Sequence, residues 1–167
     1  PGTFSRIQFL NKLILKNNNL KSIYLPFIPN FKHLDLSINQ IEKIQDDFFS
    51  NLTQMEYLNL RNNRIYEIQE KVIRNLKGLK TIYLNFNRLR KFSTNSLNQN
   101  LSIFYLELRE NLIESIDKRS FNGLINLTHL ELENNLIKSI EKFSFASLIN
   151  LASSFFLKDQ RIGDLDE

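Results

Sequence analysis

The chain has 167 residues and 42% of them are hydrophobic, which is enough for one domain with a buried core. Its 22 basic and 18 acidic residues give a net charge of +4 and form no dense basic run, so the composition does not favour a nucleic-acid partner. The absence of cysteine excludes disulfides, thiolate zinc sites and cysteine nucleophiles. No apolar run approaches about 18 residues, so we expect no membrane insertion by this segment.

One eleven-residue pattern recurs along the chain, and its clearest copy is Met55-x-x-Leu58-x-Leu60-x-x-Asn63-x-Ile65. Leu58 and Leu60 alternate as in a strand, while Asn62-Asn63 predicts a turn. In chain order the pattern begins at Leu10, Phe31, Met55, Leu79, Ile103 and Leu127, and weakly at Leu151. Each copy therefore predicts a strand that is too short to be stable except beside others.

The repeated pattern contains a column of asparagines at its ninth position. Its members are Asn18, Asn39, Asn63, Asn87, Asn111 and Asn135. An asparagine amide offers an acceptor and two donors, so stacked copies can satisfy the backbone groups of successive interior turns. We expect a structural role for this asparagine ladder.

This pattern resembles the leucine-rich repeat, LxxLxLxxNxL, over nearly the whole chain. The resemblance implies an α/β horseshoe: a right-handed solenoid with a concave parallel sheet of about seven short strands and irregular or short-helical convex returns. The 24-residue step and the phenylalanines of the returns resemble Toll-like receptor ectodomains, Slit-type guidance proteins and secreted matrix proteins. We expect residues 1–167 to form a single domain.

The returns between strands differ in composition. Pro26 and Pro29 predict an extended, tight return over 24–30, whereas 70–74 is compatible with a helix. In the last frame only Leu151 and Phe156 fit the pattern. Ser154, Asp159 and Arg161 stand at the fourth, ninth and eleventh positions, which usually hold Leu, Asn and Leu or Ile.

The ends of the sequence suggest part of a longer chain. Pro1 rather than Met comes first, and Phe4 and Ile7 fit the second half of an earlier repeat. A processed mature protein is the alternative. Solenoid ends without polar caps expose core positions, so we also expect possible end-to-end self-association of the fragment.

The sequence offers little support for catalysis or for a cofactor. Its only histidines, His33 and His129, lie four predicted strands apart, roughly 19 Å, which is too far to share one metal ion. It contains neither a glycine-rich phosphate loop nor a GxSxG motif. We expect no enzyme activity, no cofactor and no metal site.

Side chains that alternate with the core positions line the open, concave face of the predicted sheet. The candidate partner-binding residues on this face are Tyr57, Arg61, Tyr83, Phe104, Tyr105, Glu107 and Arg109. Tyr and Arg are enriched in binding hot spots, although tyrosine also simply suits strands. The pattern predicts a protein ligand on the concave face.

Three glycosylation sequons begin at Asn51, Asn100 and Asn126, and each precedes a strand frame rather than lying on the concave face. Together with the resemblance, they favour an extracellular protein or the ectodomain of a membrane receptor or adhesion protein. An intracellular scaffold or regulatory subunit in the cytoplasm and a secreted extracellular-matrix protein remain alternatives. The sequence does not identify the ligand.

Overall fold

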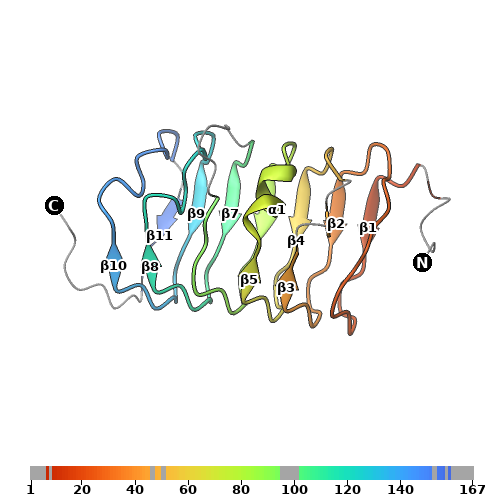
Figure 1. Ribbon diagram of the computed structural model, residues 1–167, viewed down its shortest axis with the longest axis horizontal. Coiled ribbons are helices and arrows are strands. Elements are labelled where there is room, and N and C mark those ends of the chain that lie inside the picture. The colour runs from red at the N-terminus through yellow and green to blue at the C-terminus, as the bar shows by residue number, and fades with distance from the viewer. Residues whose placement is uncertain are drawn as a thin grey trace.

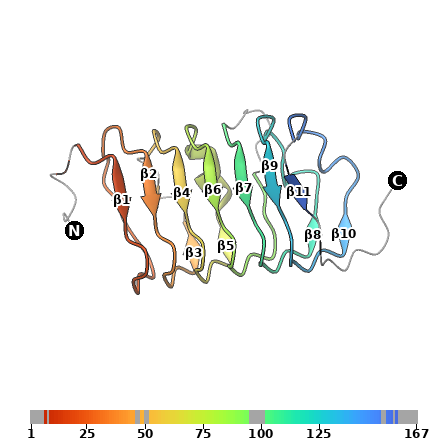
Figure 2. The same cartoon turned by 180° about the vertical axis from the view of Figure 1, so that it is seen from behind.

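The computed structural model describes residues 7, 9–45, 48–49, 52–94, 102–151, 154–156 and 158. Its main element is a seven-stranded sheet in the order β1-β2-β4-β6-β7-β9-β11. The strands are β1 (Lys12–Ile14), β2 (His33–Asp35), β4 (Tyr57–Asn59), β6 (Thr81–Tyr83), β7 (Tyr105–Glu107), β9 (His129–Glu131) and β11 (Ser154–Phe156). Every pairing is parallel, and Figure 2 shows the strands side by side along the molecule. This arrangement confirms the predicted parallel solenoid.

The chain returns between these strands through short secondary elements. Strand β3 (Lys43–Ile44) pairs with β5 (Glu67–Ile68), and β8 (Ser115–Ile116) pairs with β10 (Ser139–Ile140). Helix α1 (Glu70–Asn75) lies in one return, and these elements lie in front of the large sheet in Figure 1. The large sheet therefore keeps one face packed on the core, and none of the described helices or strands covers the other face, here called the open face.

Alternation along each strand places the apolar pattern in the core. In the third frame Leu58 and Leu60 are each 1% exposed, whereas Tyr57 and Asn59 between and beside them are only half-buried. The second and third apolar positions of the other interior frames behave in the same way. Each return contributes a further apolar layer, including the stacked rings of Phe121 and Phe145, so the repeats share one continuous core.

The asparagines at the ninth position join each repeat to the one before it. Asn87 Nδ2 donates to the carbonyl oxygens of Leu84 in its own repeat and Leu60 in the preceding repeat, both at 3.0 Å. Its Oδ1 accepts from the backbone N–H of Ile65 at 2.9 Å. The same three-way arrangement occurs at Asn39, Asn63, Asn111 and Asn135. Each buried side chain thus satisfies backbone groups that the turn leaves without partners.

The residue before each of these asparagines has a left-handed backbone. The φ angles at this eighth position are 59° at Asn17, 56° at Ile38, 55° at Asn62, 57° at Phe86, 54° at Glu110 and 52° at Asn134. Bulky residues rarely adopt this conformation. Its presence in six successive repeats shows that the turn geometry, rather than the residue type, sets the backbone here.

The last strand corrects the predicted frame by one residue. In β11, Phe155 pairs with Leu130 and Ser154 pairs with His129, so Phe155 rather than Ser154 occupies the fourth position. The backbone N–H of Asn134 also donates to Lys158 O, as expected for a frame that begins one residue after Leu151. The predicted frame is one residue early because the return before β11 contains one extra residue. The shifted strand restores an apolar residue opposite Leu130.

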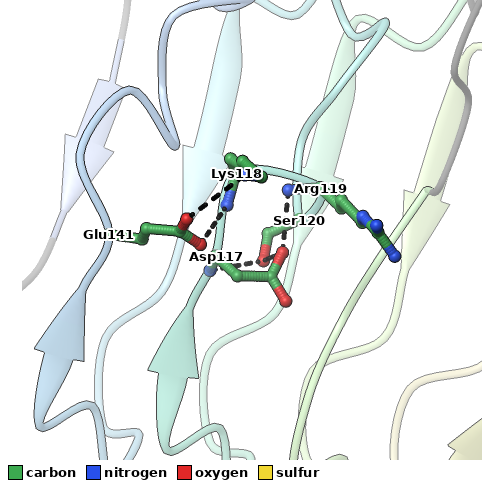
Figure 3. A network of polar contacts seen from close by, with 5 residues as sticks. All are labelled: Asp117, Lys118, Arg119, Ser120 and Glu141. Carbon is green, nitrogen blue, oxygen red and sulfur yellow. Dashed lines mark hydrogen bonds and ion pairs between the residues drawn. The ribbon is translucent and has the colours of Figure 1, made fainter.

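A polar network closes the turn that follows β8 (Figure 3). Asp117 Oδ1 accepts from the Arg119 N–H at 2.8 Å and from Ser120 Oγ at 3.3 Å, while Ser120 Oγ accepts from the Asp117 N–H at 3.1 Å. From the next repeat, Glu141 accepts from the Lys118 N–H at 3.1 Å and lies 3.8 Å from its Nζ. The network therefore fixes one turn and links it to the neighbouring return.

Candidate recognition surface on the open face

A continuous row of aromatic rings crosses five strands of the open face. We call this row the ring ladder, and its members are His33, Tyr57, Tyr83, Tyr105 and His129. The outer pairs are stacked, with centroids 3.9 Å apart for His33 and Tyr57 and 4.0 Å apart for Tyr105 and His129. Tyr83 lies 5.5 Å from both Tyr57 and Tyr105 in tilted contacts. The rings therefore form one connected surface.

Strand register explains why these rings meet. His33 is directly opposite Tyr57, and Tyr105 is directly opposite His129, so each pair stands side by side at the third position. On the central strand β6 that position holds Thr81, and Tyr83 at the fifth position supplies the middle ring. Burial raises the pKa of Tyr57, Tyr83 and Tyr105 above the usual tyrosine value, so all three hydroxyls stay protonated at neutral pH.

Two arginines share one phenylalanine beside the ladder. The guanidinium carbon of Arg61 lies 5.0 Å from the Phe86 ring centroid, and that of Arg109 lies 5.5 Å from it. Phe86 comes from the left-handed turn after β6, which directs its ring between the neighbouring repeats. The positive charges are therefore held by cation–π contacts at the same end of the strands.

One end of the ring ladder is acidic. Tyr105 donates its hydroxyl hydrogen to Glu107 Oε1 at 3.0 Å, and His129 Nε2 lies 3.1 Å from Glu131 Oε1. Desolvation is the largest influence on Glu107 and raises its pKa, with the neighbouring Glu131 charge acting in the same direction. Burial, followed by the hydrogen bond to Glu107, raises the pKa of Tyr105 strongly.

The opposite edge of the strands carries an ion-paired row. Glu56 lies 2.7 Å from both Lys32 and Lys80, which directly precede β2 and β6 on either side of β4. The hydrogen bonds from Lys32 and then Lys80 lower the pKa of Glu56 to about 2. Phe104 lies in the same row of the sequence pattern and is 44% exposed. It stands outside the ring ladder.

The structure thus places the predicted partner-binding residues in three groups. Tyr57, Tyr83, Tyr105 and Glu107 lie in or beside the ring ladder, Arg61 and Arg109 contact Phe86, and Phe104 is separate. Sequence reasoning did not select His33, His129 or Phe86 for this surface. The alignment of His33 and His129 with tyrosines at the third position was the available signal, whereas nothing in the pattern indicates the Phe86 contacts.

Alternation with the core positions predicts that the seventh position lies on the open face, but Asn85 at this position is buried. It is only 2% exposed, and its Oδ1 has no hydrogen-bond partner among the described residues. Ser37 at the same position is 3% exposed. The seventh position is therefore not uniformly part of the open face.

The sequons are only partly visible. Asn51 and Asn100 lie outside the described residues, so their surroundings are not described. Asn126 is half-buried in the turn before β9, and Thr128 of the same sequon donates its hydroxyl hydrogen to Phe104 O at 3.0 Å. Glycosylation at all three positions stays a prediction.

A hollow lies away from the ring ladder. It is an open groove on the return side, lined by residues of β5 and its flanks and by two residues of the next repeat: Tyr66, Glu67, Ile68, Gln69, Lys71, Lys91 and Ser93. Lys43 contacts the Tyr66 ring at 5.1 Å and pairs with Glu67 at 2.9 Å. This groove is the main alternative to the open face.

Comparisons with known proteins agree with the repeat architecture. The leucine-rich repeat family model matches residues 29–89, 55–112 and 99–153. A crystal structure of a TLR13–ssRNA13 complex is similar in fold, with a TM-score of 0.87 and 28% sequence identity. The match covers 99% of this chain and 23% of the TLR13 chain.

Two further findings accompany these matches. A search of curated proteins gave no match. In the part of the chain that the structure describes, no helix has the length and apolar character needed to cross a membrane. The repeated family matches span most of the residues and coincide with the stacked strands and the asparagine ladder. The chain is therefore a member of the leucine-rich repeat family.

Proposed function

We propose that this chain is a non-catalytic recognition module that binds a protein ligand on its open face. The ring ladder is the observation that carries the proposal. Five aromatic rings in contact, which carry hydroxyl and imidazole groups, form one surface at the centre of the sheet. Tyrosine is enriched in the hot spots of protein–protein interfaces, and exposed apolar patches mark binding sites. The similarity to TLR13 further supports a role as part of an extracellular receptor or adhesion protein.

A single-stranded nucleic acid is the second candidate ligand, because the similar TLR13 structure is a complex with ssRNA13. The open face argues against it. In proteins that bind single-stranded nucleic acids, the bases stack on free faces of aromatic rings beside a positively charged groove. Here His33 and Tyr57 already cover each other, as do Tyr105 and His129, and Glu107 and Glu131 place negative charge at one end. These features favour a protein ligand.

Surface plasmon resonance with the chain immobilised tests the proposal. The analyte is a partner captured from the source's secreted fraction, with a single-stranded RNA oligonucleotide as the competing probe. Tyr83→Ala and Tyr105→Ala should each weaken partner binding by at least about 2 kcal/mol, roughly thirtyfold in Kd, because they remove central rings.

The chain supplies its own matched controls. Tyr24→Ala and Tyr66→Ala remove exposed tyrosines outside the ladder and should leave binding unchanged. Tyr66 also lines the groove on the return side. Loss of binding in Tyr66→Ala with full binding in the ladder variants would contradict the open-face assignment. Tight RNA binding that is lost in the ladder variants would show that the ligand is a nucleic acid and not a protein.

A further inference from the structure

Three side chains with metal-binding atoms meet at the acidic end of the ring ladder. Glu107, His129 and Glu131 each offer one ligand atom, and these atoms all lie within 4.8 Å of one another. Glu107 on β7 is directly opposite Glu131 on β9, and His129 is two residues before Glu131 on the same face. Neighbouring strands therefore hold all three groups in fixed register.

The distances suit one ion. His129 Nε2 and Glu131 Oε1 are 3.1 Å apart. Two such atoms bound to one zinc ion at about 2.1 Å each subtend about 95° at the metal, which is within the range for adjacent ligands. Tetrahedral ligands stand about 3.4 Å apart, and the Glu107 carboxylate lies within 4.8 Å of the other two ligand atoms, so it must move closer to join the same shell.

The charges around the cluster also favour a cation. Like charges directly opposite on neighbouring strands repel, and Glu107 and Glu131 form such a pair. Within the described residues, Glu107 forms no ion pair and Glu131 pairs only with His129. Arg61, whose charge is felt at Glu107, has its guanidinium over the Phe86 ring.

Neighbouring groups hold the three side chains in place. The imidazole of His129 is stacked on Tyr105, with 6° between the ring planes. The Tyr105 hydroxyl donates to Glu107 Oε1, which leaves the other carboxylate oxygen for a ligand role. The side chains of His129 and Glu131 are only 15% and 18% exposed, so partial burial limits competition from water. Outer contacts of this kind orient metal ligands in known sites.

We propose that Glu107, His129 and Glu131 bind a divalent transition-metal ion of the zinc class on the open face. The imidazole ligand favours zinc over calcium and magnesium, which prefer oxygen ligands only. With three protein ligands, the ion keeps an open coordination position toward solvent or a bound partner. His129 does not need His33 as a second ligand, because two carboxylates beside it supply the other ligand atoms.

Isothermal titration calorimetry of the full 167-residue chain with zinc chloride, without a histidine tag, tests this site. The expected result is one zinc ion per chain. His129→Ala and Glu131→Gln should each weaken binding at least about tenfold, and Tyr105→Phe should weaken it by about tenfold through the lost contact to Glu107. Unchanged affinity in Tyr105→Phe would overturn the orienting role of that hydroxyl.

His33 provides the matched control, because it is stacked on Tyr57 almost as His129 is stacked on Tyr105 but belongs to no such cluster among the described residues. His33→Ala should bind zinc as the unmodified chain does. Imidazole NMR resonances of the unmodified chain add a test that needs no variant: zinc should shift those of His129 and leave those of His33. No saturable binding, or equal effects at the two histidines, would contradict the site.

Discussion

At the scale of single residues, the asparagine ladder replaces backbone hydrogen bonds that the turns cannot form by themselves. The Asn87 side chain contacts three carbonyl oxygens and one N–H, drawn from two repeats, and it is 8% exposed. A buried backbone group without a partner costs more than the net gain of an ordinary hydrogen bond. The ladder is therefore a local feature with a large effect on stability.

Asn87→Ala should lower the free energy of unfolding by about 1–3 kcal/mol, because it strands backbone groups of Leu60, Leu84 and Ile65. Asn18→Ala is the matched control in the same column. Asn18 is exposed, and within the described part of the chain its side chain donates only to Leu15 O and Lys16 O, so its loss should cost under about 0.5 kcal/mol. Urea melts of both variants check this, and equal losses would contradict a burial-dependent role.

The pKa of His33 should lie below its usual value of 6.5. Burial is the largest cause, the nearby Lys12 acts in the same direction, and Asp35 opposes both. Because the unfolded chain then binds the proton more tightly, the stability contribution of neutral His33 is fully present above pH 6.5. It is lost as the pH falls through 6.5 toward the folded-state pKa.

An NMR titration of the His33 ring checks this prediction. Lys12→Ala should move the pKa back toward 6.5, and Asp35→Asn should lower it further. A folded-state pKa at or above 6.5 would show that the stacked ring of His33 is better solvated than the structure indicates.

At the scale of elements, the turn after each strand imposes a left-handed backbone conformation on the residue at the eighth position, whatever its side chain. Three of the six repeats use asparagine there, which tolerates this backbone, whereas Ile38 and Phe86 do not suit it. Phe86 gains contacts with Arg61 and Arg109 in return. Ile38 is 39% exposed and gains little packing.

Ile38→Asn should therefore raise the free energy of unfolding by about 0.5–1 kcal/mol, since the left-handed conformation costs an ordinary residue about 1–2 kcal/mol. Thermal melting of the variant beside Asn62→Ile, the reverse change at the same position of the next repeat, gives the comparison. The two changes should have opposite signs. Destabilisation by both would show that side-chain packing outweighs backbone strain in this turn.

The strands and the asparagine ladder could be predicted because six copies of one pattern align at core positions such as Leu58 and Leu60. The last strand begins one residue later than predicted, because its frame fits the pattern poorly and the return before it contains an extra residue. The left-handed eighth position was not predicted because only three of its six residues are asparagines, and the others are Ile38, Phe86 and Glu110. Ring contacts and the burial of Asn85 depend on side-chain orientations that periodicity does not encode.

At the scale of the whole molecule, the stacking of repeats brings side chains from successive strands together into one continuous surface. Each of five neighbouring strands carries one ring, at the third position on four strands and at the fifth on β6, and parallel register joins the rings from His33 to His129 into a ladder. The chain aligns with only 23% of the TLR13 chain, and the solenoid gives this segment its own core and open face. The central claim is that this ladder is the contact surface for a ligand.

Hydroxyl-radical footprinting of the five tyrosines, with and without the captured partner, tests that claim most directly. Tyr57, Tyr83 and Tyr105 belong to the ladder, whereas Tyr24 and Tyr66 are 67% and 47% exposed elsewhere. We predict that the partner lowers oxidation of the three ladder tyrosines and leaves the other two unchanged. Protection of Tyr24 or Tyr66 with unchanged oxidation of the ladder would contradict the account.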